Sequence, residues 1–248
     1  MRVVPTCDYA GQVSVVVPVK DEADNILPLI EEIHASLAGK ADFEILYVDD
    51  GSSDATPQQL ALAQQRYRML RVIRHRRSCG QSTALASGVR AARHPWIATL
   101  DGDGQNDPAD IPRLLDALAP GQRTPGLSLV AGWRSRRNDS LLRKISSRVA
   151  NGVRGSLLGD RTPDTGCGLK VFPREAFLRL PFFDHLHRFL PALFLREGAQ
   201  VISVPVNHRP RTRGRSKYGV HNRLWVGIVD LFGVMWLNRR MTHPVIDE

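Results

Sequence analysis

The sequence of 248 residues contains few cysteines and no long apolar run. Its three cysteines, Cys7, Cys79 and Cys167, are odd in number and widely spaced, and none belongs to a C-x-x-C pair. This pattern argues against a disulfide framework and against a zinc site, and it favours a reducing cytosol. No stretch reaches the ~18 apolar residues that a membrane-spanning helix needs. The longest candidate, 224–237, contains Asp230.

The N-terminus also lacks the pattern of a secretory signal peptide, because Asp8 interrupts any apolar core. We therefore expect a cytoplasmic protein without a membrane span of its own. At a membrane it would lie peripherally on the inner face, and any anchor would be a separate subunit.

Charge is abundant but unevenly distributed. Residues 1–130 carry 13 Lys and Arg against 16 Asp and Glu, a net charge of −3, whereas residues 131–248 carry 21 against 9, a net charge of +12. A basic half of this kind needs an anionic partner, which can be phosphate, nucleic acid or an anionic membrane surface. Aromatic residues make up only 6% of the chain, which is little for a protein that stacks nucleic-acid bases.

Short apolar segments alternate with helical ones along the first 131 residues. Strands are expected at 12–19, 43–48, 70–74, 96–100 and 127–131, and helices at 25–37, 55–67, 80–92 and 108–118. Asp24 and Asp54 are expected to cap the first two helices. This alternation predicts an α/β fold in which helices flank a mostly parallel sheet. A further strand is expected at 201–206.

Acidic residues follow three of these strands, as Asp21-Glu22, Asp49-Asp50 and Asp101-Gly102-Asp103. Ligands of parallel α/β sheets bind beyond the carboxyl ends of the strands. Any one cluster alone is equally compatible with a ligand site and with a helix cap or a solvated turn. Three clusters at one edge repel one another unless a cation compensates them.

The segment Asp101-Gly102-Asp103-Gly104-Gln105 is the sharpest of these clusters. Two carboxylates separated by one residue, with flanking glycines, allow the backbone to turn around a hard cation. Carboxylate and amide oxygens suit Mg²⁺ or Mn²⁺ better than a soft metal. Such an ion would bridge a diphosphate and neutralise a leaving group.

As a set, several segments resemble family-2 glycosyltransferases with the GT-A fold, most closely the polyprenyl-phosphate branch typified by dolichol-phosphate mannosyltransferase. They occur in family order, at 17–22, 48–54, 80–84, 100–108, 132–134, 164–170 and 211–218. One departure concerns the first segment. The family usually has an aromatic residue and Asn where Lys20 and Asp21 stand. The resemblance places the nucleobase of the donor at these positions, so this contact departs from the family pattern.

The resemblance implies roles for individual residues. The nucleotide-sugar donor is expected to contact Pro18, Asp21, Glu22, Asp49, Asp50, Asp101, Arg211, Ser216 and Lys217. The metal ion is expected at Asp103 and Gln105, and the acceptor phosphate at Arg134 and Arg148. The expected catalytic residues are Asp103, Arg134, Arg148 and Asp164. Asp164 is either a base or acceptor-orienting group, or a turn residue.

The basic half contains two helices that could meet a membrane. Residues 140–158 carry an apolar stripe beside cations, which fits either a core helix or an interfacial helix; the resemblance favours the second. Residues 208–223 contain six cations and no carboxylate, and we expect a loop that closes over two phosphates.

Residues 224–237 fit a membrane interface, a core helix or a docking site for a membrane partner. We therefore divide the chain into a GT-A domain, 1–222, and a C-terminal amphipathic helix and tail, 223–248.

These features predict a metal-dependent, inverting glycosyltransferase. It would move a sugar from a nucleotide diphosphate to a dolichyl or undecaprenyl monophosphate at the cytoplasmic membrane face. One alternative is a family-2 enzyme that acts on a saccharide hydroxyl, which would need a clear general base. Another is a basic nucleic-acid-binding module, which the acidic edge argues against; nucleic acid is not an expected partner.

Overall fold

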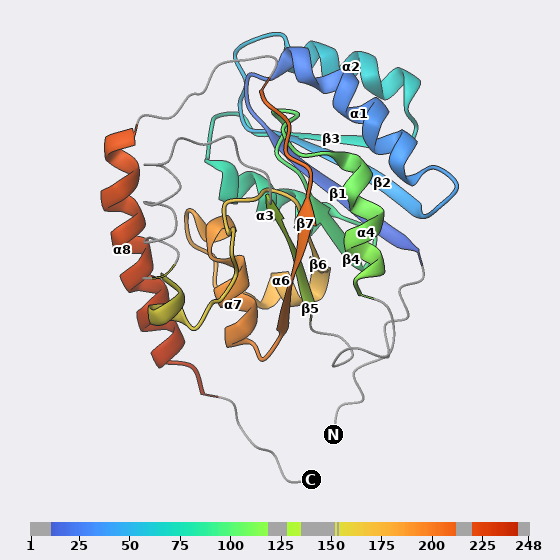
Figure 1. Cartoon of the computed structure of the whole chain (residues 1–248). Coiled ribbons are helices and arrows are strands. Elements are labelled where there is room, and N and C mark those ends of the chain that lie inside the picture. Colours follow the sequence, from blue (N-terminus) through green and yellow to red (C-terminus); the bar gives the residue numbers. More distant parts are fainter. Residues whose placement is uncertain (1–10, 119–127, 135–151, 153, 212–219, 243–248) are drawn as a thin grey trace, which may run out of the picture.

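The computed structural model describes residues 11–118, 128–134, 152, 154–211 and 220–242. Within these ranges, a seven-stranded sheet of order β3-β2-β1-β4-β6-β5-β7 forms the centre of the molecule (Figure 1). The strands are β1 (Gln12–Val19), β2 (Asp42–Asp49), β3 (Leu70–Arg74), β4 (Trp96–Thr99), β5 (Ser128–Arg134), β6 (Lys170–Pro173) and β7 (Gln200–Val206). The helices are α1 (Ala23–Leu37), α2 (Thr56–Arg66), α3 (Gln81–Ala91), α4 (Ile111–Asp116), α6 (Arg174–Arg179), α7 (Leu190–Arg196) and α8 (Val220–Arg239), with short 3₁₀ turns at Pro108–Asp110 and Leu186–Arg188.

The first four strands pair in parallel, as the alternating pattern predicted. β1 lies between β2 and β4, and β3 pairs with β2 at the edge. Val13, Val15 and Val17 enter one hydrophobic cluster, while Val16 enters the cluster on the opposite face. Because both faces of a parallel sheet are covered by helices, its strands consist of continuous apolar runs. The five strands expected before residue 132 are confirmed, with small shifts of their ends.

The two predicted helix caps differ in how closely they match the structure. Asp24 is not the cap of α1, because the helix begins at Ala23, two residues before the expected start at 25, with Glu22 as its N-cap. Asp24 instead lies in the first turn, where a carboxylate interacts favourably with the helix dipole. Ala55 is the N-cap of α2, but Asp54 Oδ1 accepts a hydrogen bond from the backbone N–H of Thr56 at 2.9 Å.

Strand β6 was not expected from the sequence. It inserts antiparallel between β4 and β5, so that Lys170 lies opposite Thr99 and Ala131. Because β6 runs in the opposite direction, its first residue lies at the edge where β4 ends. The segment that leads into β6, residues 164–169, is thereby brought to the carboxyl end of the parallel strands.

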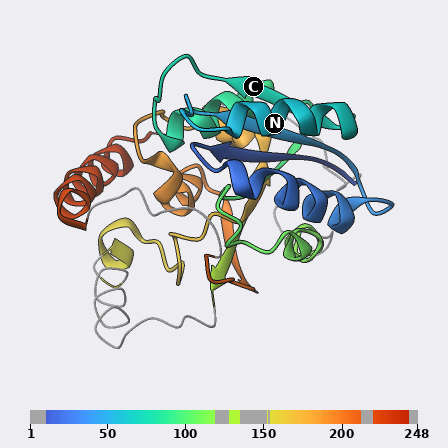
Figure 2. The same cartoon turned by 90° about the horizontal axis from the view of Figure 1, so that it is seen from above.

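Helix α8 lies along one side of the molecule beside α7 (Figures 1 and 2). Its Val234 is buried, and Leu231 and Met235 pack against the same hydrophobic cluster as α7. The opposite side of the helix exposes large apolar side chains, namely Val226, Val229, Phe232 and Trp236. Within the described part of the chain, no helix is long and apolar enough to cross a membrane. Of the helix expected at 140–158, only its last residues are described.

Candidate functional site

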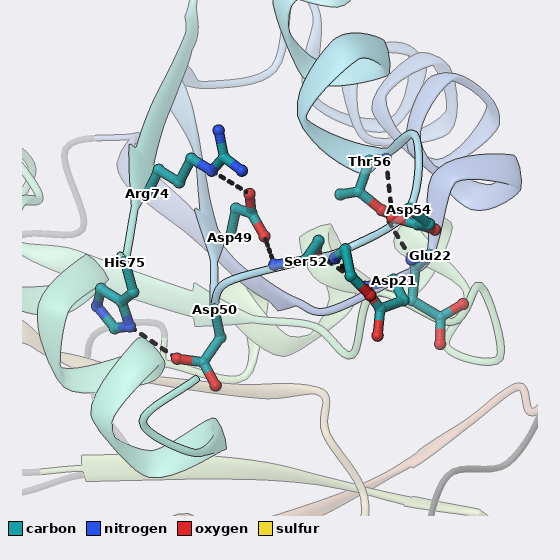
Figure 3. A network of polar contacts seen from close by, with 10 residues as sticks. Asp21, Glu22, Asp49, Asp50, Ser52, Asp54, Thr56, Arg74 and His75 are labelled. Atoms are coloured by element: carbon teal, nitrogen blue, oxygen red, sulfur yellow. Dashed lines mark hydrogen bonds and ion pairs between the residues drawn. The ribbon is translucent and has the colours of Figure 1, made fainter. Parts of the chain in front are cut away.

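The loops that follow β1 and β2 are joined by hydrogen bonds (Figure 3). Asp21 Oδ1 accepts a hydrogen bond from the backbone N–H of Ser53 at 2.6 Å, and the N–H of Asp21 donates to Ser52 Oγ at 2.8 Å. Asp21 has a φ of 47°, a left-handed conformation that Asp and Asn tolerate better than most residues. This explains why Asp can stand where the family usually has Asn.

Glu22 lies between the start of α1 and the loop after β4. Its N–H donates to Thr56 Oγ1 at 2.9 Å, and its Oε2 accepts from Asn25 Nδ2 at 2.7 Å. Its Oε1 lies 3.6 Å from Arg211 Nη1, a partner 189 residues away in the chain. Glu22 thus contributes negative charge at the point where the acidic and basic halves meet.

Asp49 ends β2 and is fully buried. Its Oδ1 accepts a hydrogen bond from Ser52 N–H at 2.8 Å, and its Oδ2 forms an ion pair with Arg74 Nε at 3.3 Å. This Oδ2 makes no hydrogen bond within the described residues. The positive charge of Arg74 compensates this buried oxygen, and a role of Asp49 in nucleoside binding remains a prediction.

Asp50 organises the segment that leads into α3. It accepts hydrogen bonds from the N–H groups of Cys79 and Gly80, from Ser78 Oγ and from His75 Nδ1, all between 2.7 and 2.9 Å. Burial alone would raise the pKa of Asp50, but these donors together hold it below its usual value. Asp50, His75 and Cys79 also offer ligand atoms within 4.8 Å of one another. Since the carboxylate already accepts four hydrogen bonds, we assign it to shaping this loop.

Asp101 follows β4 and lies against the loop before β6. Its Oδ1 accepts a hydrogen bond from Gln81 Nε2 at 2.9 Å. Burial, followed by the charge of Asp103, raises the pKa of Asp101 to about 6. A Cβ added to Gly168 would overlap the Asp101 carboxylate, and one added to Gly102 would overlap Val19. Close packing therefore requires glycine at both positions, independently of any turn that the chain makes around a cation.

Asp103 presents its carboxylate to a cation. Its Oδ1 accepts from Gln105 N–H at 3.1 Å, and its Oδ2 lies 2.6 Å from Arg211 Nη2. The side-chain amide of Gln105 donates to the carbonyl of Arg209 at 3.4 Å. The Asp103 carboxylate is a hard oxygen ligand of the kind that fits Mg²⁺ or Mn²⁺, and metal ligation by the Gln105 side chain remains a prediction. A guanidinium in hydrogen-bond contact shows that positive charge is favourable there.

Arg134 ends β5 and is held by Asp164. Its Nε and Nη2 donate to the two oxygens of Asp164 at 2.6 and 2.8 Å, and its backbone N–H donates to Oδ2 at 3.2 Å. Burial would lower the pKa of Arg134, but this bidentate pairing with Asp164 raises it above its usual value. Asp164 therefore fixes the orientation of a permanently charged guanidinium beside Gly166.

Two cations near Asp164 were missed by the sequence analysis. Lys170 is buried and donates to the carbonyls of Thr165, at 3.3 Å, and of Cys167; burial lowers its pKa. Arg154 donates to Thr165 Oγ1 and forms an ion pair with Asp160 at 3.2 Å. A lone lysine between apolar Leu169 and Val171 was a usable signal for the first. No comparable signal in the sequence marks Arg154, because other cations surround it in the chain.

The structure thus brings many of the predicted residues to one edge of the sheet. Pro18 lies beside Gly102, the Asp21 carboxylate binds the backbone of the loop after β2 at Ser53, and Arg211 contacts Asp103 and Glu22. Arg134 and Asp164 approach Asp101 from the other side, across the 166–168 segment. Arg148, Ser216 and Lys217 lie outside the described residues. The individual ligand roles remain predictions.

Two known proteins are similar in sequence to most of this chain. A dodecaprenyl-phosphate galacturonate synthase from Rhizobium johnstonii is 36% identical over 94% of this chain and 69% of its own length. An undecaprenyl-phosphate 4-deoxy-4-formamido-L-arabinose transferase from Edwardsiella ictaluri is 34% identical over 84% of this chain and 63% of its own length. The chain therefore spans about two thirds of the length of these relatives.

The solved structures agree on the fold. Glucosyl-3-phosphoglycerate synthase from Mycobacterium tuberculosis, in complex with UDP, has a TM-score of 0.66 at 20% identity, covering 94% of this chain and 81% of that one. Another complex of that enzyme, with Mn²⁺, UDP and glucosyl-3-phosphoglycerate, has a TM-score of 0.65. At this identity the likeness shows the fold alone, and it confirms the predicted α/β fold of the GT-A type.

The family assignment rests on a match to most of the sheet. The model of the family described as glycosyl transferase family 2 matches residues 14–180, which include most of β1, all of β2 to β6 and the Asp101–Gln105 turn. The expected resemblance is confirmed, and the protein belongs to glycosyl transferase family 2.

Proposed function

We propose that this protein transfers a sugar from a nucleotide diphosphate to a polyprenyl monophosphate. The observation that carries the proposal is the position of Arg134, which Asp164 orients beside the acidic edge near Asp101. An edge with buried carboxylates and a fixed arginine can hold a donor diphosphate and an acceptor phosphate next to each other. The relatives that are 34–36% identical are named for transfer to dodecaprenyl and undecaprenyl phosphate.

The chemistry needs little general-base assistance. A phosphate oxygen of the acceptor attacks the anomeric carbon and forms a new C–O bond, while the bond from that carbon to the donor diphosphate breaks, with inversion. A phosphate monoester has a second pKa of about 6 and is mostly dianionic at neutral pH. The main contributions of the protein are therefore orientation and charge compensation. Arg134 holds the acceptor phosphate, and Asp164 keeps the arginine in place.

The divalent cation is proposed to be Mg²⁺ or Mn²⁺. Asp103 would hold it with help from Gln105, and Asp101 lies near enough to add negative charge. When bound, the ion supplies positive charge to the leaving diphosphate. The Mn²⁺ complexes of the structural neighbour support the use of a divalent ion by this fold.

Helix α8 is proposed to meet the membrane surface that carries the acceptor. Its exposed apolar side is followed by Arg239 and Arg240, and this combination suits the boundary between acyl chains and anionic headgroups. We therefore propose a peripheral position on the cytoplasmic face, with a GT-A domain at 1–222 and an appended helix and tail at 223–248. A separate membrane-anchoring subunit would bind through the same helix.

A saccharide hydroxyl is a less well-supported acceptor. A hydroxyl needs a general base, and Asp164 is the carboxylate that was considered for this role. Its oxygens accept three hydrogen bonds from Arg134, and the bidentate pairing stabilises the carboxylate and weakens it as a base. The geometry therefore favours an acceptor that brings its own negative charge.

The test is an activity assay with purified protein, Mn²⁺ or Mg²⁺, a panel of nucleotide sugars and polyprenyl phosphate in detergent. We expect one donor to give a lipid-linked sugar that can be extracted into organic solvent. Parallel reactions contain soluble saccharides in place of the lipid. Turnover with saccharides alone would favour the alternative acceptor, and the absence of lipid-linked product from every donor would overturn the proposal.

A further inference from the structure

Arg211 occupies the position at Asp103 where a metal ion is expected. Its Nη2 lies 2.6 Å from Asp103 Oδ2, and its Nη1 lies 3.6 Å from Glu22 Oε1. The side chains of Asp103 and Glu22 are only 15% and 10% exposed, and that of Arg211 is 26% exposed. The ion pair is therefore largely shielded from solvent, and shielded charge pairs are stronger than surface pairs.

The backbone around Arg211 is anchored to the turn that carries Asp103. The N–H of Arg209 donates to the carbonyl of Gln105 at 2.9 Å, and His208 forms an antiparallel bridge with Asn106. The guanidinium of Arg209 also pairs with Asp107 at 2.7 Å. These contacts hold residues 208–209 beside the Asp101–Gln105 turn. The position of Arg211 over Asp103 follows from this pairing.

A guanidinium and a divalent ion at this carboxylate repel each other, so each weakens the binding of the other. Asp103 Oδ1 already accepts from the N–H of Gln105, and Oδ2 is the oxygen that Arg211 contacts. An ion that binds Oδ2 must displace Arg211 or remain close to its positive charge, which costs energy. A diphosphate changes this balance because it gives the displaced arginine a new anionic partner. Arginine is well suited to bidentate contact with phosphate.

We propose that Arg211 acts as a cation that occupies the metal position until a diphosphate arrives and then transfers to that diphosphate. The inference rests on the metal site of the proposed function and adds an order to it. Metal alone binds weakly, whereas metal and diphosphate bind with positive coupling. By thermodynamic linkage, the diphosphate strengthens metal binding by the same factor as the metal strengthens diphosphate binding.

The test measures Mn²⁺ binding without turnover, from the electron paramagnetic resonance signal of free Mn²⁺. Inorganic pyrophosphate is the probe, because it carries the diphosphate without a base or a sugar, and its own complex with Mn²⁺ is subtracted. We expect Arg211→Ala to bind Mn²⁺ alone about fivefold to tenfold more tightly than the wild type, which corresponds to the loss of one partly buried ion pair. Pyrophosphate should strengthen Mn²⁺ binding less in this variant than in the wild type.

Three control variants complete the experiment. Arg113→Ala removes one positive charge that pairs with Asp110 and not with Asp103, so it should leave the affinity for Mn²⁺ alone unchanged. Arg211→Lys keeps the charge and should retain most of the competition. Asp103→Asn should remove the Mn²⁺ site. Thermal melting of each variant checks that it is folded.

The outcomes separate this inference from the proposed function. If Asp103→Asn abolishes Mn²⁺ binding but Arg211→Ala does not strengthen it, the competition is refuted and the metal assignment stands. If Arg113→Ala strengthens Mn²⁺ binding as much as Arg211→Ala, the effect is one of general charge and the competition is again refuted. If Asp103→Asn binds Mn²⁺ like the wild type, the metal assignment itself is wrong.

Discussion

The acidic and basic halves of the molecule hold their charges by different means. Carboxylates of the first half are held by the backbone of nearby turns, as Asp49 is by Ser52 N–H and Asp50 by Cys79 N–H. Arginines of the second half are held by carboxylates, as Arg134 is by Asp164. The contacts span similar stretches of chain, 29 positions from Asp50 to Cys79 and 30 from Arg134 to Asp164. The difference lies in charge: a backbone N–H binds a carboxylate without neutralising it, whereas a carboxylate neutralises the arginine that it binds.

This difference changes what the charge split of −3 and +12 means. Described arginines of the basic half that lie near the site are already paired, namely Arg134, Arg154, Arg209 and Arg211. The electrostatic attraction for phosphate at the site is therefore smaller than the formal charge implies. Binding of an anionic substrate must rearrange some of these pairs or use the donor groups that the pairs leave over.

The largest loss of activity is expected from a substitution in the acidic half of the chain. Asp103→Asn removes the charge of the proposed metal ligand while it keeps the size of the side chain, and kcat/KM for sugar transfer should fall by about 10²–10³-fold, as for loss of one electrostatic element of an active site. Steady-state kinetics measures the loss, and an unchanged melting temperature is the control. Activity within about twofold of the wild type would mean that Asp103 does not ligate the metal.

On the basic side, Arg134→Ala should weaken the acceptor more than the donor. Loss of a charge-assisted phosphate contact is expected to cost about 2 kcal/mol, or about 30-fold in kcat/KM for the lipid acceptor. Asp164→Asn should show a smaller loss with the same preference for the acceptor, because it loosens Arg134 without removing it. Equal losses for donor and acceptor in Arg134→Ala would contradict the assignment.

The contact between the two halves is tested by Gly168→Ala. The added Cβ would overlap the Asp101 carboxylate, so the loop before β6 or the carboxylate must move, which typically costs about 1–3 kcal/mol of stability. Urea unfolding measures this loss. Gly152→Ala, at a position where an added Cβ meets nothing within 4 Å and φ, as at Gly168, is not left-handed, serves as the control without overlap. If Gly168→Ala is as stable as the wild type, the two halves are less tightly packed than described.

The smallest expected effect concerns pH. His187 Nδ1 lies 2.8 Å from Ser82 Oγ across the boundary between the halves, and burial, with nearby Arg188 and Lys170, lowers the pKa of His187 from 6.5 to about 3. The unfolded chain then binds more protons than the folded one between these values, so stability falls as the pH drops below about 6.5. We expect a loss of about 1 kcal/mol between pH 7 and pH 5, which allows for screening of a half-buried group.

Denaturant unfolding at the two pH values measures this loss, and in His187→Asn the part that this histidine contributes should vanish. The same pH dependence in wild type and variant would show that His187 is not the group responsible.

The sequence was most informative where local pattern decides the structure. The valine run of β1 is buried on both faces, so its period and length identified the strand with its correct ends. Strand β6 has only four residues, and its antiparallel pairing depends on a partner more than 70 positions away, which no local pattern records. The pairing of Arg211 with Asp103 is of the same long-range kind. The sequence predicts Gly102 to allow a turn around a cation, but the structure shows that close packing also requires glycine there and at Gly168.

The short antiparallel strand β6 also determines where the chain can change in length during evolution. Asp164 is fixed at one end of the segment by Arg134, and Lys170 is fixed at the other end by its pairing in β6. An insertion or deletion of one residue between them would shift the Thr165 and Cys167 carbonyls relative to Lys170, or separate Arg134 from Asp164. Among homologous enzymes we thus expect gaps to accumulate upstream of Asp164, while the seven positions from Asp164 to Lys170 keep a constant length.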